Sequence, residues 1–253
     1  MKNEQFTITK TALVLLSFIF LLAFSFCSKD SDNDKDAIPA AGDNSNDITY
    51  ESLTVTDREG NVYEAVQIGD QIWMAENLNV QDHYYGISMC PGVLTSNVLI
   101  QAYCAMYGNL YSYAAILDGD PPHYRVQGLC PDGWSIPRED DWAELEMYLG
   151  MPEQDVYGAG LDRGTNEGRM LKSESLWDDS GNGSNDYGFN VLPSGFSVGT
   201  NPAIVGRNAR FWTYPPLSSA AYTRFFDKES DNIGRSQNQL GHLLSLRCVK
   251  NPE

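Results

Sequence analysis

The sequence is short of positive charge: 17 Lys and Arg stand against 34 Asp and Glu, which gives a formal net charge of -17 at pH 7. Nucleic-acid phosphates and anionic membrane surfaces carry the same sign, so the field of the whole chain would repel both. We therefore expect no nucleic-acid partner and no attachment to a membrane through surface charge.

A long hydrophobic run is also missing. The longest apolar stretch, residues 12–26, spans 15 residues, whereas a membrane-spanning helix needs about 20. Lys2 and Lys10 precede this stretch. A short apolar core behind positive charge is typical of a secretory signal peptide, which we place at residues 1–26.

Histidines, close cysteine pairs and repeats are scarce or absent. The three histidines, His83, His123 and His242, lie far apart without i, i+4 spacing, so the sequence predicts no zinc site. None of the five cysteines forms a C-x-x-C pair. No segment of about 20 to 50 residues recurs, which argues against a repeat architecture.

A cysteine stands at the end of the apolar stretch. Cys27 is followed by SKDSDNDKD, which resembles the acidic export signal of Bacteroidetes-type lipoproteins. This resemblance implies that Cys27 carries palmitate or a similar acyl chain and that the protein faces the exterior from the outer membrane. Phe26 departs from the small residue usual before such a cysteine, so an uncleaved anchor and a freely secreted form are the alternatives.

The segment after Cys27 offers almost nothing to bury. Residues 27–46 are rich in Asp, Asn, Ser, Ala and Gly, which predicts a disordered tether. Residues 47–253 remain for folded structure and are enough for one ordinary domain.

The other four cysteines, Cys90, Cys104, Cys130 and Cys248, are an even number in an exported chain and predict two disulfides. Three pairings are open. The separations in sequence favour Cys90 with Cys104 and Cys130 with Cys248. In the chain-entropy model these bonds would stabilise the fold by about 3 and about 4 to 5 kcal/mol.

Apolar patterning predicts an α+β fold. Alternating residues and turn signals indicate a β-meander at the start of the domain, with strands over residues 53–57, 62–69 and 71–78. Helical spacing predicts helices over residues 109–117, after Pro137 and near residues 169–173. Further strands are expected at residues 187–196, 210–214, 222–227 and 243–249.

Six segments resemble, in order, the successive blocks of the Fibrobacter succinogenes major domain family: residues 57–79, 107–115, 128–150, 187–196, 211–213 and 246–250. The resemblance implies a C-type-lectin-like architecture but no catalytic set, since none can be carried over residue by residue. Arg138 departs from the Ser or Thr that usually caps the helix after Pro137. Because an arginine cannot accept the free backbone N–H bonds, Ser135 is the alternative cap.

One pattern would fit an enzyme. Residues 195–199, GFSVG, match the G-x-S-x-G motif of serine hydrolases around Ser197, with Asp227 or Asp231 and then His242 following in hydrolase order. A nucleophile elbow needs a helix directly after the serine. Pro202 and Gly206 stand where that helix would form, so we expect an accidental match and no catalytic activity.

One loop concentrates oxygen ligands. Residues 177–188, WDDSGNGSNDYG, contain five side chains that would suit calcium: Asp178, Asp179, Asn182, Asn185 and Asp186. The same residue types make ordinary turns, and the chain contains neither the E-P-N nor the W-N-D tripeptide of calcium-dependent lectins. We expect no cofactor, with calcium in this loop as the less favoured alternative.

Aromatic residues in loops are the remaining candidates for ligand binding. Tyr84, Tyr85, Tyr124 and Tyr214 fall in segments that look like loops, where their rings could stack on sugars. The tryptophans of the family-like blocks, Trp73, Trp134, Trp142 and Trp212, are expected in the core. The sequence thus favours a non-catalytic surface module that binds a glycan or a protein. An adhesin or assembly subunit is the first alternative, and a hydrolase using Ser197 is the second.

Overall fold

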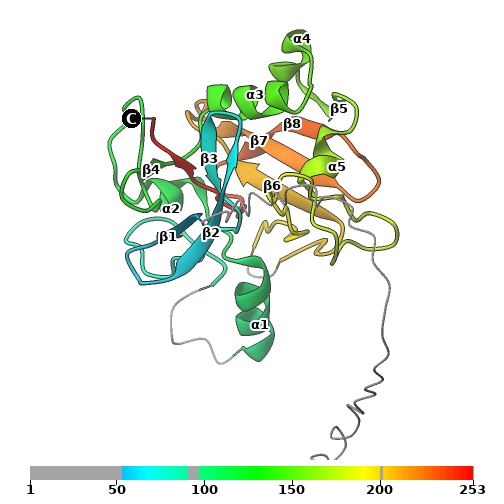
Figure 1. The fold of residues 1–253 in the computed structure, drawn as a ribbon. Helices are drawn as coiled ribbons and strands as arrows, with labels where there is room; N and C mark the ends of the chain where they lie inside the picture. Colours follow the sequence, from blue (N-terminus) through cyan, green and yellow to red (C-terminus); the bar gives the residue numbers. More distant parts are fainter. Residues whose placement is uncertain (1–52, 91–96, 200–201, 253) are drawn as a thin grey trace, which may run out of the picture. The chain divides into compact units, whose positions relative to one another are not determined.

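The computed structural model describes residues 53–90, 97–199 and 202–252 (Figure 1). The predicted signal peptide, the acylated Cys27 and the tether at residues 27–46 lie outside these ranges. In the part of the chain that is described, no helix has the length and apolar character needed to cross a bilayer.

The first sheet is antiparallel and has the order β1-β2-β3-β9-β4. Strands β1 (Leu53–Thr56), β2 (Val62–Ile68) and β3 (Gln71–Met74) confirm the predicted meander. Strand β9 (Val249–Lys250) lies between β3 and β4 (Trp134–Ser135). The end of the chain is therefore inserted between the first strands of the domain and its middle.

The second sheet is also antiparallel, in the order β5-β8-β7-β6 (Figure 1). Strands β6 (Asn208–Trp212) and β7 (Ala220–Asp227) overlap two of the predicted strands. Strands β5 (Gly160–Arg163) and β8 (Ile233–Gln239) were not predicted. Strand β8, IGRSQNQ, has a mainly polar sequence, which hides its period-2 pattern.

The helix predicted after Pro137 is α3 (Glu139–Tyr148). The Asp141 carboxylate accepts a 2.7 Å hydrogen bond from the backbone N–H of Arg138, which fixes the first turn from inside the helix. The alternative cap is wrong, because the Ser135 hydroxyl instead donates to Asn251 at 2.7 Å. Two short helices follow, α4 (Glu153–Val156) and α5 (Glu167–Leu171), and the second corresponds to the helical piece expected near residues 169–173.

Two other helix assignments from the sequence need correction. Helix α2 (Tyr113–Leu117) is shorter than the predicted 109–117, because the chain at Tyr111 is extended and exchanges two backbone hydrogen bonds with Leu244, at 2.8 and 3.0 Å. Helix α1 (Val98–Tyr107) was missed. It is apolar on its exposed side as well as its buried side, so no amphipathic stripe marks it.

Two predicted strands are only partly present. Residues 187–196 form isolated bridges, Lys172 with Val191 and Gly195 with Ala209, because Pro193 and the left-handed Asn190 (φ 58°) interrupt the extended chain. Residues 243–248 likewise form single bridges, and only β9 forms a ladder at the end of that segment.

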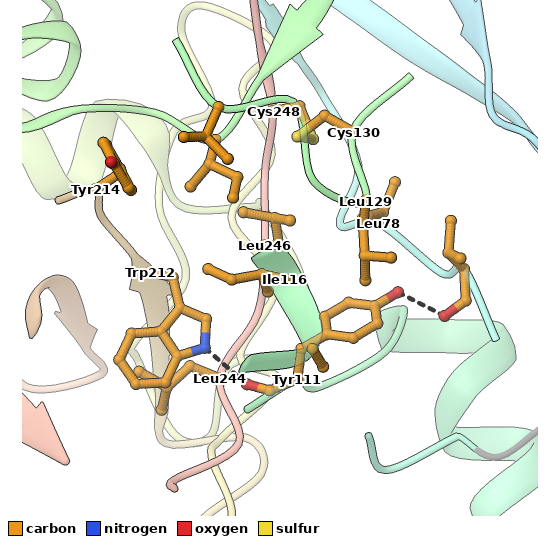
Figure 2. Close-up of a cluster of buried hydrophobic side chains, with 14 of the residues drawn as sticks. Leu78, Tyr111, Ile116, Leu129, Cys130, Trp212, Tyr214, Leu244, Leu246 and Cys248 are labelled. Atoms are coloured by element: carbon orange, nitrogen blue, oxygen red, sulfur yellow. Dashed lines mark hydrogen bonds between the residues drawn. A yellow bond between two sulfur atoms is a disulfide. The ribbon is translucent and has the colours of Figure 1, made fainter. Parts of the chain in front are cut away.

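Two large clusters of buried side chains form the core, and we call them the first and second core clusters. The first surrounds Tyr111, Trp134 and Trp212, and Figure 2 shows the indole N–H of Trp212 donating to the carbonyl of Tyr111 at 2.6 Å. The second surrounds Trp73 and Trp142, whose ring centroids are 4.9 Å apart. All four tryptophans expected in the core are buried, as predicted.

Both favoured disulfides are present, Cys90–Cys104 and Cys130–Cys248. The second bond lies at the edge of the first core cluster (Figure 2). The first bond ties α1 to the segment before it, within a small third cluster that includes Tyr103. The domain is thus a mixed α and β fold with antiparallel sheets, few helices and two disulfides.

Candidate binding surface

Tyr84 and Tyr85 lie in the loop after β3 with their rings exposed, at 89% and 57%. The backbone N–H of Tyr84 donates to Asp118 at 2.9 Å, and the other oxygen of that carboxylate lies 2.6 Å from the Arg58 guanidinium. The Tyr85 ring covers Gly119, where a Cβ atom would come within 2.6 Å of the ring. The two rings are therefore presented to solvent by a loop that is fixed at its backbone.

Tyr124 is exposed as well, at 67%. The guanidinium of Arg138 lies 4.3 Å from the centroid of its ring, and Arg138 donates to the carbonyl of Tyr124 at 2.8 Å. A cation over an aromatic ring holds the ring in place without burying it. The structure thus confirms exposed positions for three of the four tyrosines selected from the sequence, which we call the exposed tyrosines.

The fourth, Tyr214, is not available to a ligand. Its side chain is 5% exposed and packs in the first core cluster (Figure 2). Its backbone is held on both sides, since its N–H donates to Pro137 at 2.8 Å and its carbonyl accepts from Glu139 at 3.2 Å. The prediction for Tyr214 is therefore wrong: a loop that looked exposed is pinned to the start of α3.

One hollow of about 270 Å³ lies where the start of β2 meets the last turn of α1. Four of its lining residues are asparagines, and we call it the asparagine hollow: Asn61, Asn77, Asn79 and Asn190. Glu76 adds a carboxylate, and Val62 and Met106 add exposed apolar side chains. Sequence reasoning missed this site because its residues come from segments far apart along the chain.

A second hollow of about 340 Å³ carries charges of both signs and lies between the β2–β3 turn, α3 and the end of the chain. Arg125 in its wall is already paired with Asp141 at 2.7 Å. Burial, with Asp141 and Asp70 adding to it, raises the pKa of Glu144 on the same wall. This hollow therefore has a paired cation and neighbouring carboxylates in its wall, and Lys250 adds a second basic side chain to its lining.

Ser197 has the surroundings of a turn residue. It is fully buried, and its hydroxyl exchanges hydrogen bonds of 3.0 Å with the backbone N–H and carbonyl of Gly199. The described residues between Ser197 and β6 contain no helix, which a nucleophile elbow requires.

The other members of the proposed triad make different contacts. His242 Nδ1 lies 3.5 Å from Asn238, and burial lowers the pKa of this histidine. Asp227 accepts from the backbone of Glu229 at 2.9 Å, and Asp231 lies 3.9 Å from Lys172. The two acids thus serve to fix turns and a buried lysine.

The loop proposed for calcium uses several of its oxygens internally. Asn182 accepts from the backbone of Trp177 at 3.1 Å, Asn185 accepts from Asn190 at 2.7 Å, and Asp179 pairs with Lys228. Asp178 and Asp186 are exposed. Within the described ranges, no group of three or more His, Cys, Asp or Glu side chains is placed to hold a metal ion. The side-chain oxygens of Asn182, Asn185 and Asp179 thus fix the conformation of the loop and its contact with Lys228.

Comparison with known proteins agrees with the resemblance of the six segments. The chain matches the family model of the Fibrobacter succinogenes major domain over residues 66–250. No curated protein and no solved structure matches the chain. Because the match runs from the middle of β2 to the last strand, it covers the whole second sheet and all of the first sheet except β1 and the start of β2. The chain therefore belongs to the Fibrobacter succinogenes major domain family.

Proposed function

We propose that this protein is a cell-surface binding module that recognises a glycan and carries out no catalysis. In this proposal the domain has a C-type-lectin-like architecture and is anchored to the outer membrane through acylated Cys27, facing the exterior. The two disulfides suit an oxidising, exported location.

The observation that carries the proposal is the contrast between tyrosine and tryptophan. All five tryptophans are buried, whereas the rings of Tyr84, Tyr85 and Tyr124 are exposed on loops that are held by hydrogen bonds and by Arg138. Where the backbone that carries a tyrosine is already fixed, binding loses less entropy, and the ring offers both an apolar face and a hydroxyl. Sugar rings present the matching combination of C–H groups and hydroxyls.

The absence of catalysis is proposed from the geometry around Ser197. Its buried hydroxyl is engaged with Gly199, and Nδ1 of His242 lies 3.5 Å from Asn238. The proposal also includes no cofactor, so glycan binding should persist when calcium is chelated.

A second candidate is a subunit of a surface assembly or an adhesin that binds another protein. It is favoured by the exposed apolar side of α1, where Val98, Leu99 and Met106 face solvent. Contiguous exposed apolar side chains commonly mark protein interfaces.

A glycan array probed with the full chain in detergent tests the proposal. We expect specific glycans to be bound, with affinity at least tenfold lower in the variants Tyr84→Ala and Tyr124→Ala. Tyr157→Ala is the matched control, because Tyr157 is also exposed but follows α3 in the sequence. This variant should bind as the parent does. An array with no bound glycan, or ester turnover lost with Ser197→Ala, would contradict it.

A further inference from the structure

The asparagine hollow contains polar side chains whose hydrogen bonds are not satisfied within the protein. The amide of Asn77 is fully used, since it donates to Tyr107 at 2.9 Å and accepts from Arg247 at 2.7 Å. The side-chain amides of Asn79 and Asn190 have no such partners in the described part of the chain, and Asn79 Oδ1 is a covered oxygen without a hydrogen bond.

A buried acceptor without a hydrogen bond destabilises the folded state by about 1 to 3 kcal/mol. A ligand that donates a hydrogen bond to it would remove this penalty. Among the described residues, covered side-chain oxygens without a partner occur on Asn79, Asn208 and Thr213, and of these only Asn79 lines either hollow. The rest of the Asn79 side chain is partly exposed. Asn79 therefore brings an amide without a partner among the described residues to the wall of the hollow.

The charges around the hollow favour an uncharged ligand. Glu76 supplies a carboxylate to the wall, with one oxygen held by the backbone N–H of Glu64 at 2.9 Å. Behind the wall, Arg247 is fully buried, and no acidic side chain of the described residues lies within salt-bridge distance of it. It donates to Asn77 and to the carbonyl of Asn190, the latter at 3.3 Å. The two opposite charges offset each other locally, while the net charge of -17 repels anions from the whole molecule.

The size and the apolar side of the hollow restrict the ligand further. Pockets for drug-sized molecules begin at about 300 Å³, so 270 Å³ suits a smaller group. Val62 and Met106, which are both exposed, and Leu192 add apolar side chains to its lining. The site thus combines apolar side chains with amide and carboxylate groups.

The hollow is also linked to Tyr84 through one turn. In the β1–β2 turn, Arg58 pairs with Asp118, which holds Tyr84, and Glu59 accepts from the backbone of Asp82 at 2.5 Å. The same turn continues directly into Asn61 and Val62, which line the hollow. A bound chain of several sugars could therefore extend from the hollow across this turn.

We propose that the asparagine hollow is the subsite for one neutral sugar unit, whose hydroxyls bond to Asn79, Asn190 and Glu76 and whose apolar face packs on Val62 and Met106. This assignment rests on the proposed function for the class of ligand, and it adds a specific place and a preference for uncharged sugars.

Substitutions on the exposed side of α1 test the assignment without touching the core. Ala105 lines the hollow and Ala102 does not, although both are exposed alanines on the same helix. Ala105→Phe should fill the hollow, and Ala102→Phe is the matched control. Asn79→Leu removes the unpaired amide, with Asn232→Leu, at a similarly half-buried turn, as its control.

The measurement is binding of the full chain in detergent to immobilised neutral glycans ending in glucose, galactose, mannose or N-acetylglucosamine, beside sialylated and sulfated ones. We expect neutral glycans to bind, at least tenfold more weakly in Ala105→Phe and Asn79→Leu and within twofold of the parent in both controls. Binding that survives Ala105→Phe but is lost in Tyr84→Ala would overturn the subsite and keep the proposed function. A preference for sialylated or sulfated glycans would also overturn it, and no glycan binding by the parent would remove both proposals.

Discussion

The two core clusters differ in how they accommodate polar groups. In the first, neutral phenol hydroxyls are buried: Tyr63 donates to Asp57 at 2.6 Å and Tyr111 donates to the carbonyl of Val80 at 2.8 Å. Beside the second, ions are buried: Glu146 is bonded to Arg163 at 2.9 Å and to Arg224 at 2.5 Å. A phenol needs one acceptor, whereas a buried ion needs its whole set of partners.

The difference indicates which interactions stabilise each half of the domain, where one half surrounds the first core cluster and the other surrounds the second. The ions form one network that ties α3 to the second sheet, because Glu139 on the same helix also pairs with Arg224 and Arg235, at 3.2 and 2.7 Å. The first core cluster has no comparable network and holds the Cys130–Cys248 disulfide instead. We therefore expect the two halves to fail under different perturbations.

The largest expected effect is the loss of the Cys130–Cys248 bond. It closes a loop of 118 residues, so the chain-entropy model gives a loss of about 5 kcal/mol for the double variant Cys130→Ala, Cys248→Ala. The 14-residue Cys90–Cys104 loop gives about 3 kcal/mol for its own double variant. Guanidinium unfolding of each protein measures the difference. Equal losses would show that loop length does not decide the contribution of these bonds.

Removing the charge of Glu146 is the matching test of the second half. Glu146→Gln keeps the size of the side chain but leaves Arg163 and Arg224 as buried cations without this carboxylate. Breaking a buried pair from one side typically destabilises by about 3 to 5 kcal/mol. Urea unfolding should show this loss, with the exposed Glu174→Gln as control. A loss below about 1 kcal/mol would mean that the network contributes little to stability.

The elements that could be predicted are those whose sequence pattern repeats within a few neighbouring residues. The β1–β3 meander and α3 were predicted because alternation and helical spacing repeat within a few residues. Helix α1 was missed because its exposed side is apolar. Strand β8 was missed because its sequence is mainly polar, although Arg235 within it is buried by contacts that include Glu139 on α3 and the carbonyl of Tyr157. These features depend on neighbours that are distant in sequence.

The residues of the candidate site also fall into two groups, those that local sequence signals predicted and those that only the tertiary fold brings together. Tyr84, Tyr85 and Tyr124 were predicted from composition and turn signals around them, and exposure of their rings agrees. Tyr214 has similar local signals, but its backbone bonds to Pro137 and Glu139 and draws it into the core. The asparagine hollow could not be predicted, because Asn79 and Asn190 are brought together only by the tertiary fold.

Alkaline pH should destabilise the half of the domain around the first core cluster, because that cluster contains buried tyrosine hydroxyls. Burial raises the pKa of Tyr63, Tyr111 and Tyr113, with the hydrogen bond to Asp57 adding to the shift of Tyr63. Above about pH 10 these groups ionise in the unfolded chain but stay protonated in the fold. Their contribution is therefore complete below pH 10 and falls by about 1.4 kcal/mol per pH unit for each tyrosine above it.

The variant Tyr111→Phe tests this pH dependence at a single residue. The slope of unfolding free energy against pH between 10 and 11 should become shallower by about 1 kcal/mol per unit, because a tyrosine in the unfolded chain goes from about half ionised to mostly ionised over this range. Tyr84→Phe, at an exposed ring, is the control and should leave the slope as it is. An unchanged slope in Tyr111→Phe would show that another group governs alkaline unfolding.

The smallest expected effect on stability lies at the surface, at Asp118. This residue has a left-handed backbone (φ 46°), accepts from the N–H of Tyr84 and pairs with Arg58, which is itself 42% exposed. Asp118→Asn retains an acceptor and a residue type that tolerates this conformation, and it removes only the ion pair. An exposed pair contributes about 0 to 1 kcal/mol, so unfolding should change by less than 1 kcal/mol.

Glycan affinity in the same variant gives the sharper result. If Asp118 acts by positioning Tyr84 through its backbone N–H, Asp118→Asn should bind within about twofold of the parent, whereas Asp118→Ala, which loses the acceptor, should bind several-fold more weakly. Equal affinities in the two variants would show that the loop presents Tyr84 without Asp118. Buried ions and disulfides would then determine only whether the domain folds, and the loop contacts would have no separate part in recognition.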